Sequence, residues 1–210
     1  MAKKLHSEML YLLETTVAEC MHGRPWRETP FAAFACPSCG NPRVDAYPQP
    51  LPVETVYRQR SSIDLATQAA VIARGRLVDV LRSYNPGIVP GPVTMIDGRL
   101  QPDSFSLHFP QHSEIRVRGG VGSSRRKFGY SWCTTCSRAE AVIGCLVAPL
   151  HVLRREIPCG KVYVEGHSFV IVTEEVRRDD RLSEFKDLRF VSLPIFDESL
   201  EHVPMFDDSH

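Results

Sequence analysis

Two Cys-x-x-Cys pairs are the residues of this sequence whose types and spacing could do chemistry. The first pair is Cys36-Pro37-Ser38-Cys39-Gly40, and the second is Cys133-Thr134-Thr135-Cys136. Four thiolates arranged in two such pairs can close a tetrahedral Zn²⁺ site, with each sulfur about 2.3 Å from the ion. A closed site has no open coordination position, so the sequence predicts a zinc ion that holds structure. Its predicted ligands are Cys36, Cys39, Cys133 and Cys136.

The two pairs also admit other interpretations. They could be two unrelated turns, or one of them could be a redox pair, which requires a thiolate activated at a helix N-terminus. Because the pairs lie far apart in the chain, a shared ion requires the fold to bring the two turns together. Gly40 favours a metal-binding knuckle, since backbone amides must turn toward the sulfurs. At the corresponding position the second pair has Ser137.

A zinc-deaminase interpretation arises because His-x-Glu precedes each pair, as His6-Ser7-Glu8 and as His112-Ser113-Glu114. Zinc deaminases combine His-x-Glu with Pro-Cys-x-x-Cys, in which the His and both Cys bind zinc and the Glu moves protons. Ala35 and Trp132 occupy the two positions that require proline. No P-loop, Gly-x-Ser-x-Gly elbow or His-Glu-x-x-His occurs either. The sequence therefore names no catalytic residue.

Composition and charge narrow the class of protein. The 210 residues are 43% hydrophobic and 24% charged, which is ordinary for a globular protein. Lys and Arg together number 25, and Asp and Glu together also number 25, so the formal net charge is zero. A net charge of zero argues against a nucleic-acid partner or a membrane surface. No apolar run is long enough for a signal peptide or a membrane span, which predicts a cytoplasmic protein.

Seven cysteines, an odd number, fit a reducing compartment better than a disulfide framework. The three that lie outside the pairs are expected to be small buried side chains: Cys20, Cys145 and Cys159.

Hydrophobic periodicity predicts several elements. Met9–Thr15 alternates as a strand, although a short amphipathic helix also fits. A helix of about ten residues begins after Gly75 and ends at Asn85-Pro86-Gly87. Residues 64–73 could extend that helix or form a strand. The prolines of residues 41–51 predict an extended loop.

Further strands are expected at residues 93–96, 105–109, 168–172 and 188–191, with Thr173 as the N-cap of a short helix. The predicted fold class is α+β, with mixed sheets and few short helices, stapled by the four-cysteine zinc knuckle pair. Residues 1–160 would form the zinc-knuckle region, with knuckles at 36–40 and 133–137. Residues 161–210 would form a strand, helix, strand unit and an acidic tail, packed into the same domain.

The whole pattern resembles the double-CXXCG motif family, bacterial proteins with many paralogues in myxobacteria, some of which are immunity proteins against contact-delivered toxins. The resemblance spans most of the chain. It rests on the two knuckles, on Tyr47-Pro48 after the first, on the central helix, and on the ending Phe169-Val170-Ile171-Val172-Thr173-Glu174 with Leu188-Arg189-Phe190 and Leu193-Pro194.

This resemblance implies a non-enzymatic immunity protein that binds and neutralises a cognate bacterial toxin. A basic toxin cleft would suit the acidic tail, which supplies the candidate partner-binding residues Asp197, Glu198, Glu201, Asp207 and Asp208. The basic residues between Arg116 and Lys127 would suit an acidic toxin instead. Two alternatives remain open: a zinc-knuckle module that binds nucleic acid, and a zinc-dependent deaminase or thiol redox enzyme.

Overall fold

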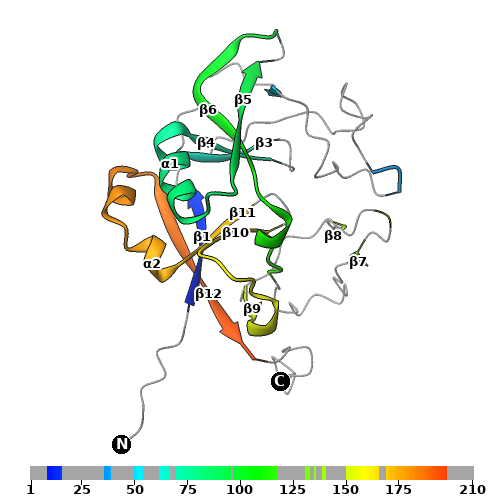
Figure 1. The fold of residues 1–210 in the computed structure, drawn as a ribbon, viewed down its shortest axis with the longest axis vertical. Helices are drawn as coiled ribbons and strands as arrows, with labels where there is room; N and C mark the ends of the chain where they lie inside the picture. Colours follow the sequence, from blue (N-terminus) through cyan, green and yellow to red (C-terminus); the bar gives the residue numbers. More distant parts are fainter. Residues whose placement is uncertain are drawn as a thin grey trace, which may run out of the picture.

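The computed structural model shows mixed sheets with few short helices (Figure 1). This confirms the predicted α+β character, with strands more numerous than helices. The structure describes residues 9–15, 36–38, 50–53, 62–66, 70–95, 97–117, 131–132, 135, 139–140, 150–165 and 169–197. Among these residues, no helix combines the length and the apolar character needed to cross a membrane.

Sheet A, the first of two five-stranded sheets, combines strands from the beginning and the end of the chain. Its order is β10-β11-β1-β12-β9. All neighbours are antiparallel except β12 and β9. The strands are β1 (Met9–Thr15), β9 (Val152–Leu153), β10 (Val162–Glu165), β11 (Phe169–Thr173) and β12 (Leu188–Phe196). The strand interpretation of Met9–Thr15 is therefore confirmed, and sheet A draws strands from both sides of residue 160.

Sheet B has the order β2-β5-β6-β4-β3 and lies in the middle of the chain. Its strands are β2 (Leu51–Val53), β3 (Ile63–Ala66), β4 (Ala70–Arg74), β5 (Val89–Met95) and β6 (Leu100–His108). The segment left open between helix and strand is thus a strand pair, β3 and β4, joined in antiparallel register. The strands expected at residues 93–96 and 105–109 belong to the β5–β6 hairpin.

Helix α1 (Gly75–Tyr84) has the ten residues expected of it, and Asn85 ends it by donating its backbone N–H to Leu81 O at 2.9 Å. Its start depends on a residue of sheet B. Asp103 has φ 61° and accepts the Gly75 backbone N–H on Oδ1 at 3.1 Å. A carboxylate at this position satisfies one of the unpaired amides of the first turn and favours the positive end of the helix dipole.

The apolar face of α1 fills the space between the two sheets. Its residues Leu77, Val78, Val80 and Leu81 are buried in one hydrophobic cluster. That cluster also contains side chains of β4 and β6 and alternate side chains of β1, β10 and β11. The opposite face of sheet A is buried in a second cluster, which includes Leu10, Leu12, Ile115, Val117, Val152, Tyr163, Ile171 and Leu193. Sheet A is therefore apolar on both faces, which explains its near-continuous hydrophobic strands.

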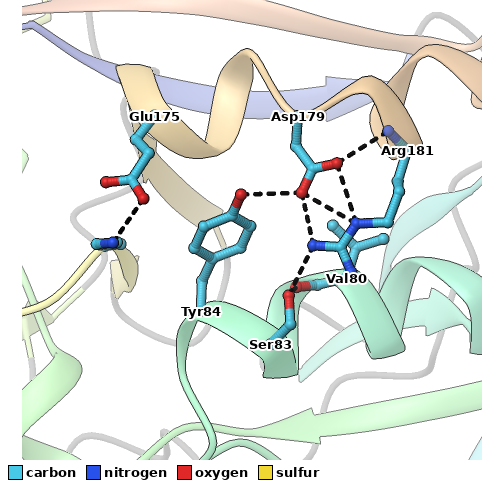
Figure 2. A network of polar contacts seen from close by, with 7 residues as sticks. Val80, Ser83, Tyr84, Glu175, Asp179 and Arg181 are labelled. Atoms are coloured by element: carbon cyan, nitrogen blue, oxygen red, sulfur yellow. Dashed lines mark hydrogen bonds and ion pairs between the residues drawn. The ribbon is translucent and has the colours of Figure 1, made fainter.

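A strap of residues 174–187 connects β11 to β12 and crosses α1 (Figure 2). It contains α2 (Glu174–Arg177) and the 3₁₀ helix η6 (Asp180–Glu184). Tyr84 of α1 donates its hydroxyl to Asp179 Oδ2 at 2.9 Å, and Arg181 Nη2 donates to Ser83 Oγ at 2.9 Å. The hydrogen bonds from Arg181 hold the pKa of Asp179 well below its usual range. The strap is thus fixed to α1 by charge-assisted hydrogen bonds.

Thr173 occupies the N-cap position of α2 as expected, but its side chain does not cap the helix. Its backbone is extended, with φ −77° and ψ 167°, and its Oγ1 is buried with no hydrogen-bond partner among the described residues. Acidic side chains in the first turn supply the favourable charge instead. Glu174 accepts hydrogen bonds from Arg177, which together with Tyr11 lower the Glu174 pKa to about 2.

Asp187, at the end of the strap, joins the two sheets. It accepts the Ser62 backbone N–H at 2.6 Å and the Ser62 hydroxyl at 2.5 Å, at the start of β3. The Thr15 hydroxyl, at the end of β1, donates to it at 3.2 Å. Burial is the largest single effect and raises the Asp187 pKa, but the hydrogen bonds outweigh it and leave the pKa below its ordinary value.

Candidate metal centre

The second Cys-x-x-Cys pair lies between two short paired strands. Strands β7 (Ser131–Trp132) and β8 (Ala139–Glu140) are antiparallel, with Trp132 opposite Ala139. In sequence, Cys133 directly follows β7 and Cys136 precedes β8. A metal knuckle is a tight turn that brings both sulfurs to one side of the backbone, which fits a pair placed between two paired strands.

The first pair begins in a turn. Pro37 and Ser38 form the turn, and Cys36 before them is 2% exposed. Cys36 is the one predicted ligand within the described residues. Cys39, Cys133 and Cys136 lie outside them, as does Gly40. Among the described residues, no three His, Cys, Asp or Glu side chains gather as a metal site would require.

A hydrogen bond joins the two turns at equivalent positions. Ser38 Oγ lies 2.7 Å from Thr135 Oγ1, and either hydroxyl can donate. Each residue is the third of its own Cys-x-x-Cys pair, so the corresponding parts of the two knuckles face each other. Contact of this kind is the condition that a shared ion imposes on two pairs so far apart in sequence. An exposed fraction of only 2% for Cys36 also suits a thiolate shielded from water by a closed site.

Of the candidate partner-binding residues, only Asp197 is described. Its side chain is 80% exposed and accepts a hydrogen bond from Arg154 Nε at 2.7 Å. Arg154 belongs to the 3₁₀ helix η5 (Arg154–Glu156), which follows β9. The sequence did not indicate this pairing. Glu198, Glu201, Asp207 and Asp208 lie outside the described residues.

The His-x-Glu motif ahead of the second pair is divided between two environments. His112 is exposed in the 3₁₀ helix η4 (Gln111–Ser113). Glu114 lies against sheet A, where it forms an isolated parallel bridge with Val164 of β10. His6 and Glu8 lie outside the described residues, as do the basic residues between Arg118 and Lys127.

Cys159 is exposed, so the expectation that it is a buried side chain is wrong. The reason lies in its neighbours, because Cys159 and Gly160 form the turn before β10, and Gly160 has φ 153°. A turn of this kind runs over the surface. Cys20 and Cys145 lie outside the described residues.

Sequence reasoning missed one acidic residue of the core. Glu165 ends β10 and is only 9% exposed. Burial, the largest effect, and the Glu114 carboxylate raise the Glu165 pKa to about 7, while the Arg116 guanidinium acts in the opposite direction. The local signal was the continuous apolar run of Val162, Tyr163 and Val164 directly before it, which is typical of a buried strand.

No family model matches the chain, and a search of the curated proteins found no match.

Proposed function

We propose that the chain is a non-enzymatic immunity protein that binds and neutralises a cognate bacterial toxin, and that one structural Zn²⁺ ion joins its two knuckles. The observation that supports the metal is the 2.7 Å hydrogen bond between Ser38 and Thr135. The support for the toxin partner is the resemblance of the two knuckles and the C-terminal elements to the double-CXXCG motif family.

Cys36, Cys39, Cys133 and Cys136 would hold the ion as four thiolates. When bound, the ion would supply a strong link between the N-terminal part of the chain and its middle. Since four protein ligands complete a tetrahedral zinc site, no position is left for a substrate. Function would then belong to a surface of the protein that the metal supports.

The acidic tail is the proposed partner surface. An inhibitor of this kind buries about 800 Å² on each partner over a surface that the toxin needs. Asp197, which begins the tail, is fixed by Arg154 beside the end of β12, where it remains largely exposed. A fixed acidic group of this kind steers and orients a basic partner more than it adds affinity.

Co-expression tests the immunity function. The protein encoded directly upstream is expressed in a host cell alone and together with this chain. The upstream protein is expected to arrest growth, and the chain is expected to restore it. An Asp197→Asn variant should bind the same protein more slowly at low salt, while Asp180→Asn, an exposed change in the strap, should not. If the upstream protein is harmless on its own, the proposal fails.

Metal analysis tests the zinc site separately. Protein purified under reducing conditions should carry about one zinc per chain, measured by plasma mass spectrometry. Replacement of Cys36 or Cys133 by serine should abolish this zinc, whereas Cys159→Ser should retain it. A wild-type zinc content near zero would contradict the shared site and leave the co-expression result to be judged alone.

A further inference from the structure

The segment of residues 114–117 covers the second hydrophobic cluster of sheet A. Ile115 and Val117 are 2% and 3% exposed and contribute directly to this cluster. The segment is attached to the edge strand β10 by the bridge between Glu114 and Val164 and by a 2.9 Å hydrogen bond from Ile115 N–H to Val164 O.

A buried carboxyl group lies next to this attachment. Glu165 follows Val164, and strand alternation places its side chain on the same face of sheet A as Tyr163, which belongs to the second cluster. The residue opposite it on β11 is Phe169, which packs against the same cluster. Glu165 therefore lies on the face of sheet A that carries the second cluster, to which the covering segment also contributes.

Charges on the covering segment act on Glu165 in opposite directions. Glu114 disfavours a second negative charge at Glu165, while Arg116 favours it. Among the described residues, these are the charged groups that act on the Glu165 pKa, and β11 contributes the uncharged Phe169. Burial of an ionised carboxylate in such a site is costly unless it is fully paired, so the neutral acid is the form that suits the closed arrangement.

We propose that Glu165 is a pH-sensitive switch: the neutral acid keeps residues 114–117 packed on sheet A, and ionisation of the acid loosens this segment. On ionisation the proton passes to solvent, and the carboxylate gains hydration only if the segment moves away. A rise in pH would thus loosen the cover that residues 114–117 form on the second cluster of sheet A.

The sign and size of the effect follow from linkage. The Glu165 pKa is about 7 in the closed form and 4.5 when the group is solvated. Opening therefore becomes more favourable as pH rises between these values and stops changing well above pH 7. Between pH 6 and pH 8, the opening equilibrium should increase about tenfold.

Hydrogen exchange at the Ile115 amide tests this proposal, because that amide forms the attachment itself. Its protection factor, corrected for intrinsic exchange, should fall about tenfold from pH 6 to pH 8 in the wild type. Amides in the centre of β1 should stay far better protected than the Ile115 amide at both pH values, which separates local opening from global unfolding. In Glu165→Gln the fall should disappear, and in the exposed control Glu184→Gln it should persist.

A constant Ile115 protection factor in the wild type would overturn the proposal, and so would a fall that persists in Glu165→Gln. If the Gln variant does not fold, the Glu165 carboxyl group is titrated by NMR in the wild type. A titration midpoint near 7 that coincides with the pH range in which Ile115 protection falls supports the proposal. A midpoint near 4.5 contradicts it.

Discussion

The joint between the two sheets and the joint between the two knuckles are built differently. Sheets A and B meet through many apolar side chains around α1, and two aspartates of the strap, Asp179 and Asp187, add hydrogen bonds at its middle and its end. The described contact between the knuckles is a single hydrogen bond between hydroxyl groups, Ser38 to Thr135. In our proposal, the remaining connection between the two knuckles is made by one metal ion that both cysteine pairs bind.

The difference teaches where each joint is vulnerable. A joint that spreads its free energy over many contacts loses about 1–3 kcal/mol when one contact is removed. A joint that depends on one ion loses nearly all of its free energy when one ligand is removed, because metal binding and folding are coupled. Single substitutions at the two joints should therefore differ sharply in effect.

The largest effect is expected at the knuckles. Cys36→Ser or Cys133→Ser should each lower the free energy of unfolding by several kcal/mol, because each removes a ligand from the proposed site. Denaturant unfolding under reducing conditions measures the change. A zinc chelator should destabilise the wild type and leave both variants nearly unaffected.

Cys159→Ser is the matched control, because Cys159 is exposed and belongs to neither knuckle. Its unfolding curve should overlay that of the wild type. If the curves of Cys36→Ser and Cys133→Ser also overlay it, the knuckle joint does not depend on a metal and the comparison fails.

An intermediate effect is expected at Asp187. Asp187→Asn should cost about 2 kcal/mol, because it removes a charged acceptor from Ser62 and Thr15. Since the Asp187 pKa is lowered in the folded protein, this stabilising effect is complete above its ordinary pKa of 3.8 and disappears as pH falls below it. The difference between the wild type and the variant should therefore shrink below about pH 4.

Asp180→Asn serves as the control for Asp187, since Asp180 is an exposed acid on the same strap. Its effect should stay within about 0.5 kcal/mol. Equal losses for the two variants would indicate a general dependence on negative charge in the strap and would contradict a specific joint at Asp187.

The smallest effect is expected at Tyr84. Tyr84→Phe removes one hydroxyl, but Asp179 keeps its hydrogen bonds from Arg181. The expected loss in the free energy of unfolding is about 1 kcal/mol. Tyr84→Leu should cost more, because it also removes the ring that packs against the core and lies 5.9 Å from the Arg181 guanidinium. Equal losses for both variants would show that the aromatic ring contributes nothing beyond what leucine supplies, and an unchanged Tyr84→Phe would show that the hydroxyl contributes nothing.

The elements that the sequence predicted best are those whose signals are local. Helix α1 combines an apolar stripe with the stop signal Asn85-Pro86-Gly87, and its length follows directly. Its N-terminal cap could not be predicted, because Asp103 comes from a strand that is distant in sequence. For the same reason the periodicity of residues 64–73 was ambiguous, since pairing with β6 decides that β4 is a strand.

Prediction of the candidate site had the same limit. Spacing alone indicated which cysteines form pairs, but the contact between Ser38 and Thr135 depends on the fold. The burial of Glu165 likewise depends on β11 and on residues 114–117 closing around it. An acid at the end of an apolar strand is usually solvated, so the apolar run before Glu165 did not by itself indicate its burial.

The position of β1 has a consequence for the order of folding. Strand β1 lies between β11 and β12, so its backbone amides and carbonyls find their partners only after residues 169–196 have been synthesised. Sheet A therefore has a high contact order, which favours slow folding. Before these residues leave the ribosome, sheet B and α1 can form, but the apolar side chains of β1 remain exposed. A chaperone that binds short apolar segments would find its target there, until β12 emerges and closes the sheet.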